Sequence, residues 1–294
     1  NNITLPIMVM NPAHESFDTL LKYRLEPEVY SFKILQSFAD YLQQRPCKIH
    51  IKLDTGMHRL GFNEDEIDGL ITLLDERPYL KVASIFSHMA GADESIHDAF
   101  SREQGKRFLH MADKISTALH YRPIFHLLNS PGILRLPEFQ CDMVRLGIGL
   151  YGVDPTTDQI GKLKPVASLK TIISQIKHIR PGESIGYGRH GKAGKPLTTA
   201  TIAIGYADGF SRAFSQGKGK VMVNGKPARV IGNVCMDMTM IDITGIPARE
   251  GDEVVVFGEE LPIEELAKSI NTIPYEILTN TSERVKRVFV AESI

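Results

Sequence analysis

The feature that most constrains this chain is a regular alternation of short apolar runs with helical patterns over residues 5–146. The apolar runs have the length of β-strands, and segments with apolar residues three or four positions apart separate them. Because parallel strands need long crossover connections, this alternation predicts a parallel sheet of six strands. The strands are expected at residues 5–10, 29–30, 47–53, 81–87, 123–128 and 143–146.

Polar residues follow several of these predicted strands. Asp54, His88, the pair Asn129-Ser130 and Arg145 each lie where a strand ends. In a β/α barrel, the loops at the carboxyl ends of the strands carry the active site. An open doubly wound sheet is the alternative, but no Gly-rich nucleotide turn follows the first strand. We therefore favour a (β/α)8-type barrel whose N-terminal strands are missing, because six strands are two fewer than eight.

The pattern changes at about Pro165. Short strands joined by turn pairs follow, and Asn224-Gly225 is a strong hairpin signal. Only one helix is expected there, at residues 263–270. The second half is thus predicted to be a mostly β domain, and the boundary is placed within residues 153–163. This divides the chain into domains at residues 1–158 and 159–294.

Composition excludes several classes of protein. The net charge is −1 with both signs interspersed, which gives no electrostatic basis for binding nucleic acid or anionic lipid. The cysteines, Cys47, Cys141 and Cys235, are odd in number and widely spaced, which argues against disulfides and against a zinc site. No apolar run approaches the roughly 18 residues that span a bilayer. We expect a cytoplasmic protein without a metal ion.

Residues 201–212 are the most informative short stretch. A strand ends at Gly205, and the turn pair Asp208-Gly209 follows directly, so Tyr206 lies where the chain reverses. An isolated tyrosine at such a place is more often a packing residue than a catalyst. Other stretches of the sequence favour the catalytic interpretation.

Taken together, these stretches resemble the alanine racemase family of fold-type III pyridoxal 5′-phosphate enzymes. The resemblance extends over nearly the whole chain and is carried by residues 52–61, 87–93, 129–130, 143–152, 205–209 and 232–237. Gly-Tyr-Ala-Asp-Gly at 205–209 and Val-Cys-Met-Asp at 234–237 are the most specific. The family implies an incomplete eight-stranded barrel, a following β domain, and a head-to-tail homodimer with shared active sites.

The resemblance also implies roles for the substrate-binding residues. Tyr206 matches the base that exchanges the α-proton of L-alanine, and its phenol needs a nearby cation to lower its pKa. Arg59 matches the arginine that binds the substrate carboxylate. Met236 and Asp237 match the pair at the substrate entrance. Lys52 matches a lysine that is carbamylated in many members, although an unmodified lysine fits the sequence equally well.

Further residues match the cofactor site. Ser130, Gly147 and Ile148 resemble the cradle of the cofactor phosphate, built from a hydroxyl and backbone N–H groups. Arg145 resembles the arginine that faces the pyridine nitrogen and weakens the electron sink. His88 resembles the histidine that holds this arginine.

His126 belongs to the same layer as His88, and we interpret it as structural.

Two positions depart from the family. The lysine that binds the cofactor as a Schiff base lies in a Val-Lys-Ala-Asn-Ala-Tyr-Gly-like stretch, which is absent here. We therefore expect that the chain lacks an N-terminal segment, and that it is inactive without it. Glu283 stands where a phosphate-binding tyrosine is usual, so it is not counted as a ligand, and Arg284 or Lys286 would have to compensate its charge.

The expected function is the interconversion of L-alanine and D-alanine by two-base proton transfer, which supplies D-alanine for peptidoglycan. The missing start also suggests the racemase part of a fusion behind the ligase that adds D-alanyl-D-alanine to the murein precursor. One alternative is a catalytically inactive binding module, which the absent lysine and Glu283 favour. Another is a racemase for serine or lysine.

Overall fold

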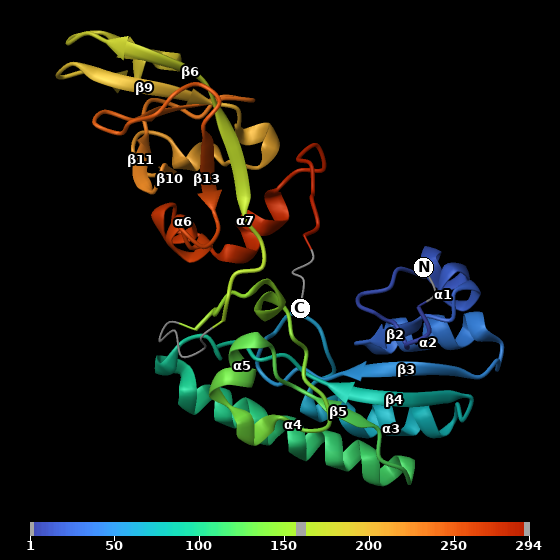
Figure 1. Ribbon diagram of the computed structural model, residues 1–294. Helices are drawn as coiled ribbons and strands as arrows, with labels where there is room; N and C mark the ends of the chain where they lie inside the picture. The colour runs from blue at the N-terminus through green and yellow to red at the C-terminus, as the bar shows by residue number, and fades with distance from the viewer. Residues whose placement is uncertain (1–2, 157–162, 291–294) are drawn as a thin grey trace. The chain divides into compact units, whose positions relative to one another are not determined.

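A computed structural model describes residues 3–156 and 163–290 of the chain (Figure 1), which form two compact units. Among the described residues, the first unit comprises 3–147 with 154–156, and the second comprises 148–153 with 163–290. The predicted boundary between residues 158 and 159 lies outside the described residues. Within the described ranges, no helix is both long and apolar enough to cross a membrane.

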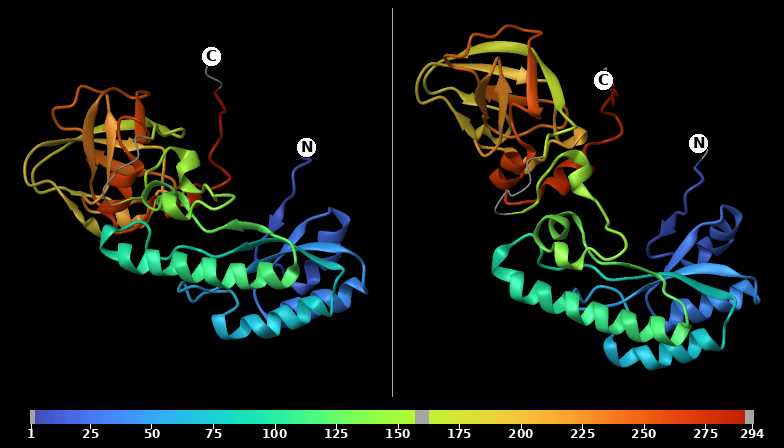
Figure 2. Two further views of the ribbon diagram at one scale, coloured as in Figure 1. Left: turned by 90° about the horizontal axis from the view of Figure 1, so that it is seen from below. Right: turned by 60° about the horizontal axis from the view of Figure 1, so that its bottom comes forward.

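The first unit contains a parallel sheet, as predicted, with the strand order β1-β2-β3-β4-β5. Figure 2 shows helices α3 and α4 side by side along one face of this sheet. The strands are β1 (Met8–Val9), β2 (Glu26–Val29), β3 (Cys47–Lys52), β4 (Leu80–Phe86) and β5 (Ile124–His126). The helices are α1 (Phe17–Lys22), α2 (Phe32–Leu42), α3 (Ile67–Asp75), α4 (Asp98–Leu119) and α5 (Ser130–Arg135).

The prediction of six strands was wrong by one. Residues 143–146 form a single parallel bridge, between Met143 and His126, instead of a strand. The backbone N–H of Arg145 still bonds to Leu128 O at 2.9 Å, but Leu128 lies beyond the end of β5. The chain then enters the 3-10 turn Ile148–Tyr151. Pairing on one side only, over so few residues, does not extend the sheet.

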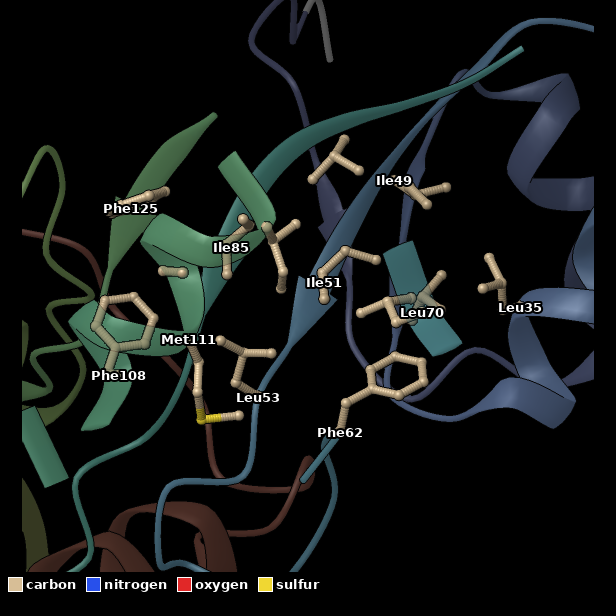
Figure 3. Close-up of a cluster of buried hydrophobic side chains, with 14 of the residues drawn as sticks. Leu35, Ile49, Ile51, Leu53, Phe62, Leu70, Ile85, Phe108, Met111 and Phe125 are labelled. Carbon is tan, nitrogen blue, oxygen red and sulfur yellow. The ribbon is translucent and has the colours of Figure 1, made fainter. Parts of the chain in front are cut away.

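The two faces of the sheet differ in chemistry because side chains alternate along a strand. One face is apolar: Ile49, Ile51 and Ile85 pack with Leu70 of α3 and Met111 of α4 (Figure 3). The opposite face carries a set of buried or half-buried polar side chains, which we call the polar face. Its members are Glu26, Glu28, His50, Lys52, Ser84 and His126.

The second unit is mostly β, as predicted, and its strands close into an antiparallel barrel with the order β10-β11-β12-β9-β6-β13. The predicted hairpin joins β10 to β11, where Asn224 and Gly225 both have positive φ, of 48° and 72°. The strands are β6 (Leu169–Ile179), β9 (Leu197–Ile202), β10 (Lys220–Val223), β11 (Lys226–Val230), β12 (Thr239–Asp242) and β13 (Glu253–Phe257). The short strands β7 (Ser184–Ile185) and β8 (Gly191–Lys192) form a separate pair.

The expectation of a single helix in this unit was wrong. The predicted helix is present as α6 (Ile263–Ser269), and a second helix, α7 (Pro274–Asn280), follows it. Helix α7 has only seven residues, and Ile277 is its one buried side chain. Helix α6 has the same length but buries Ile263, Leu266 and Ala267. With a single buried side chain, α7 shows too little apolar periodicity to be recognised from sequence.

Candidate active site

Arg145 lies at the carboxyl ends of β4 and β5, where its guanidinium meets several acceptors. Its Nη1 bonds to Nδ1 of His126 at 2.6 Å and to the backbone oxygen of the same residue at 3.2 Å. Its Nη2 bonds to Ser87 O at 2.6 Å and to Leu127 O at 3.1 Å, with Nδ1 of His88 at 3.4 Å. Within the part of the chain that the structure describes, the Nε–H has no acceptor. One donor of the five is thus available to a ligand.

Burial lowers the pKa of Arg145 to about 10, while the charge of Glu28 opposes this shift. The guanidinium therefore remains charged at neutral pH. Burial, followed by the charge of Arg145, lowers the pKa of His88 to about 4 and that of His126 to about 3. Both imidazoles are neutral at pH 7 and can accept from Arg145. The structure places His126, interpreted from sequence as structural, closer to Arg145 than His88.

Lys52 forms a buried ion pair with Glu28. The Lys52 Nζ lies 3.0 Å from Glu28 Oε1, and the two side chains are 7% and 1% exposed. Glu28 Oε1 has no hydrogen-bond partner among the described residues, so the contact with Lys52 is an ion pair. Glu28 Oε2 accepts from Asn11 N at 2.5 Å. Sequence reasoning missed Glu28, although a glutamate beside apolar Val29 in a strand is an unusual signal.

Arg59 lies in the tight loop that follows β3. The carboxylate of Asp54 accepts from Gly56 N at 2.9 Å and from His58 N at 3.1 Å, which fixes the start of this loop. A Cβ at Gly61 would lie 2.5 Å from Asp54 N, so only glycine fits there. Arg59 itself is exposed, and its charge contributes to the lowered pKa of His88. The loop thus holds a charged, accessible guanidinium near the His88 end of the site.

The expected phosphate cradle has its parts in place within each unit. In the first unit, Ser130 Oγ accepts from Gly147 N at 2.9 Å, while Asn129 caps α5 through Gly132 N. In the second unit, the backbone N–H of Ile148 donates to the Tyr275 hydroxyl at 3.0 Å. Sequence reasoning missed Tyr275, because helix α7 was not predicted.

Tyr206 is held on a turn fastened to the 235–236 stretch. Its backbone N–H bonds to Cys235 O at 3.0 Å, and the next N–H, of Ala207, bonds to Met236 O at 3.0 Å. A Cβ at Gly205 would lie 2.3 Å from both of these oxygens, so the close approach requires glycine. The side chains of Tyr206 and Met236 are both exposed. The turn therefore presents a phenol and a thioether together on a fixed backbone.

Arg284 joins this turn to Asp237. Its Nε bonds to Asp208 at 2.7 Å and its Nη2 to Asp237 at 2.5 Å, and hydrogen bonds to these carboxylates raise the pKa of Arg284. Asp208 also accepts from Gly205 N at 2.9 Å, at the base of the tyrosine turn. Arg284 is therefore engaged by two aspartates and does not compensate Glu283, which is exposed.

The predicted residues are thus divided between the two units. The first unit contains Lys52, Arg59, His88, Ser130, Arg145 and Gly147, and the second contains Ile148, Tyr206, Met236 and Asp237. The described ranges contain no group of three or more histidine, cysteine or acidic side chains arranged to hold a metal ion.

Comparison with known proteins gives matches over nearly the whole chain. The family model described as "Alanine racemase, N-terminal domain" matches residues 1–155, and "Alanine racemase, C-terminal domain" matches residues 166–289. The alanine racemase of Clostridium tetani (strain Massachusetts / E88) is 38% identical over 303 residues, which cover 99% of this chain and 78% of that protein.

Solved structures agree with these matches. Alanine racemase from Streptomyces coelicolor A3(2) is 31% identical with a TM-score of 0.91, over 98% of this chain and 79% of that chain. The enzyme of Bartonella henselae, whose structure has covalently bound pyridoxal phosphate, is 29% identical with a TM-score of 0.88. That match covers 99% of this chain and 80% of the Bartonella chain.

Proposed function

This chain belongs to the alanine racemase family, and from that premise we propose that it interconverts L-alanine and D-alanine with pyridoxal 5′-phosphate as cofactor. The reaction would take place in the cytoplasm and supply D-alanine for peptidoglycan. The observation that carries the proposal is the charged guanidinium of Arg145, whose Nη groups are fully engaged and whose Nε–H is left for a ligand.

The residues present fit the cofactor. In the first unit, a pyridine nitrogen can accept from the Nε–H of Arg145, and a phosphate can accept from Gly147 N and the Ser130 hydroxyl. In the second unit, Ile148 N and the Tyr275 hydroxyl are donors of the same types, which phosphate prefers. Tyr275 thus offers the phenol that Glu283 does not provide.

When bound, the cofactor withdraws electrons from Cα of the amino acid and so makes the α-proton acidic. Arg59 binds the substrate carboxylate through its planar fork and fixes which face of Cα is presented. Tyr206 Oη removes the α-proton of L-alanine, or returns it. Met236 and Asp237, held by the backbone bonds of the tyrosine turn and by Arg284, narrow the entrance. We propose that each Tyr206 serves the site of the other subunit in a homodimer.

Arg145 limits the reaction to proton exchange. A guanidinium that keeps its charge cannot give its proton to the pyridine nitrogen, so the electron sink stays weak and side reactions are suppressed. His88 and His126 are neutral and only accept hydrogen bonds from Arg145, so neither ring takes the proton that gives the guanidinium its charge.

Proton transfer on the opposite face of Cα needs the lysine that carries the cofactor. No lysine of this sequence lies in a Val-Lys-Ala-Asn-Ala-Tyr-Gly-like stretch, and Lys52 matches a lysine with another role. We propose that a lysine outside these 294 residues supplies it in the natural protein. Borohydride reduction of the natural protein with bound cofactor, followed by peptide mass spectrometry, tests this, and a protein without any cofactor-modified lysine would refute it.

For Lys52 we propose the unmodified ammonium form. A carbamate on Lys52 would place a second anion beside the buried carboxylate of Glu28, and like charges at that distance repel strongly. The ammonium instead balances Glu28. In this arrangement Glu28 supplies the negative charge that acts on Arg145.

Activity measurements test the function as a whole. The natural protein should racemise L-alanine, and Tyr206→Phe should abolish the exchange of its α-proton. Racemisation of serine or lysine with higher efficiency would favour the related-enzyme alternative. An inactive binding module, which the absent lysine motif and Glu283 favour, predicts no racemisation of any amino acid by the natural protein.

A further inference from the structure

Five side chains form one continuous hydrogen-bonded chain across the polar face. Nη1 of Arg145 lies 2.6 Å from His126 Nδ1, and His126 Nε2 lies 2.9 Å from Ser84 Oγ. Ser84 Oγ lies 2.6 Å from His50 Nδ1, and His50 Nε2 lies 2.9 Å from Glu26 Oε2. The row thus connects the half-buried guanidinium of Arg145 to the carboxylate of Glu26 through four hydrogen bonds, and its other four side chains lie on four neighbouring strands.

The register of the strands produces this row. His50 of β3 lies opposite Ser84 of β4, while Glu28 of β2 lies opposite His50. Glu26 precedes Glu28 by two residues, so the two carboxylates point to the same face. His126 follows the partner of Ser84, Ile124, by two residues. The row therefore crosses the sheet diagonally, from the amino end of β2 to the carboxyl end of β5.

The donors and acceptors of this row can be ordered in only one way when both histidines are neutral. Arginine has no acceptor, so His126 Nδ1 must accept and its proton must be on Nε2. Ser84 then accepts from His126, and its own proton goes to His50 Nδ1. His50 Nε2–H donates to Glu26. Burial lowers the pKa of both His50 and His126, in agreement with neutral rings.

We propose that Glu26 is a positioning residue for Arg145, acting through His50, Ser84 and His126. The opposite tautomer of His126 would turn an N–H toward Nη1 of Arg145 and displace the guanidinium. The negative charge of Glu26 favours the ring tautomer of His50 that donates to it, and the row passes this preference on to His126. What Arg145 does for the reaction rests on the proposed function, but the row itself does not.

The tautomers can be measured without the cofactor. In protein labelled with ¹⁵N-histidine, with signals assigned from His50→Asn and His126→Asn, both rings should carry their proton on Nε2 at neutral pH. An Nδ1–H tautomer or an imidazolium at either position would overturn the proposal.

Transmission along the row needs a second measurement. Glu26→Gln should shift the ¹⁵N signals of His126, which Glu26 does not contact, and Ser84→Ala should abolish that shift. Ser101→Ala is the matched control, because Ser101 is also buried and its hydroxyl has no partner in the described residues. A shift that is absent, or that is equal in the Ser84→Ala and Ser101→Ala backgrounds, would overturn the proposal.

The positioning role is read from turnover of the natural protein. Glu26→Gln keeps an acceptor for His50 but removes the charge, so it should lower kcat by up to about tenfold, the factor by which a hydrogen bond to a charged acceptor exceeds one to a neutral acceptor, with little change in KM. In the Ser84→Ala background the same substitution should have no further effect. An unchanged kcat would overturn the positioning role. A natural protein that racemises no amino acid would refute the proposed function. The tautomer measurement would still test the order of donors and acceptors in the row.

Discussion

The Lys52–Glu28 pair gives the sharpest test of the site, and Glu28→Gln is the perturbation. Glutamine keeps the shape of the side chain and an acceptor for Asn11 N, but removes the charge. At 3.0 Å and an effective dielectric constant of about 20, the attraction between the two charges is on the order of 5 kcal/mol. Breaking one partner of a buried pair typically costs about 3–5 kcal/mol, because the other charge is left without compensation.

Native-state hydrogen exchange of the β3 and β4 backbone amides is the appropriate assay, because it reports the stability of the first unit separately. Glu28→Gln should lower the free energy of opening by about 3 kcal/mol or more. The control is Glu138→Gln, which removes a carboxylate from an exposed pair with Arg102 in the same unit. That change should cost less than about 1 kcal/mol. Replacing both members, as Lys52→Met with Glu28→Leu, should recover most of the loss.

The sign of the effect separates the two states of Lys52. If Lys52 carried a carbamate, Glu28→Gln would remove a repulsion between two anions and would stabilise the unit or leave it unchanged. A loss comparable to that of Glu138→Gln, or a gain, would refute the buried ion pair. In ¹³C-bicarbonate, the protein with Glu28 should show no carbamate signal on Lys52, and such a signal would contradict the same reasoning independently.

Three other predictions concern different parts of the site. The pKa values of His88 and His126 lie below the ordinary 6.5, so the stability that these neutral rings contribute is complete above pH 6.5 and is lost as the pH falls toward 4 and 3. In hydrogen exchange of the first-unit amides between pH 7 and 5, the free energy of opening should fall by about 1.4 kcal/mol per histidine for each pH unit below 6.5. His126→Asn should remove the part of this fall that His126 causes. Gly205→Ala should destabilise the second unit by about 2 kcal/mol or more in urea unfolding, whereas Gly194→Ala, with open space around its Cβ, should be nearly neutral; equal effects would contradict the close approach. Arg284→Lys should lower kcat of the natural protein several-fold, because an ammonium cannot bridge the carboxylates of Asp208 and Asp237 as a guanidinium does. A kcat equal to that of the wild type would argue against this bridging role of Arg284.

Much of the fold follows from local patterns in the sequence. The alternation of strands and helices predicted the parallel sheet, and Asn224-Gly225 predicted the hairpin between β10 and β11. Residues 143–146 have the sequence pattern of a strand but form one bridge. Whether an edge segment pairs along its length depends on the segments that lie beside it in the fold. Helix α7 was missed because Ile277 is its one buried side chain, so no apolar periodicity appears, whereas α6, of the same length, buries three. In both cases tertiary contacts decide which conformation a segment of seven or fewer residues adopts.

The same distinction separates the two kinds of site residue. Arg145, Lys52 and Tyr206 stand in motifs, so a resemblance was enough to find them. Glu26 and Glu28 stand in no such motif. Sequence reasoning did not find them, because their carboxylates reach the site only through the order of β2, β3 and β4 in the sheet.

Glu26 and Glu28 stand two residues apart on one strand, and each begins a different route toward Arg145. Glu26 reaches it through the hydrogen-bonded row. Glu28 pairs with Lys52, whose Nζ lies 5.6 Å from the centre of the Phe86 ring, while the guanidinium of Arg145 lies 5.3 Å from the same centre. Because the two routes share no polar atom before Arg145, Glu26→Gln and Glu28→Gln should be additive in stability. Strong coupling between them would mean that the polar face acts as one network and that the two carboxylates do not have separate tasks.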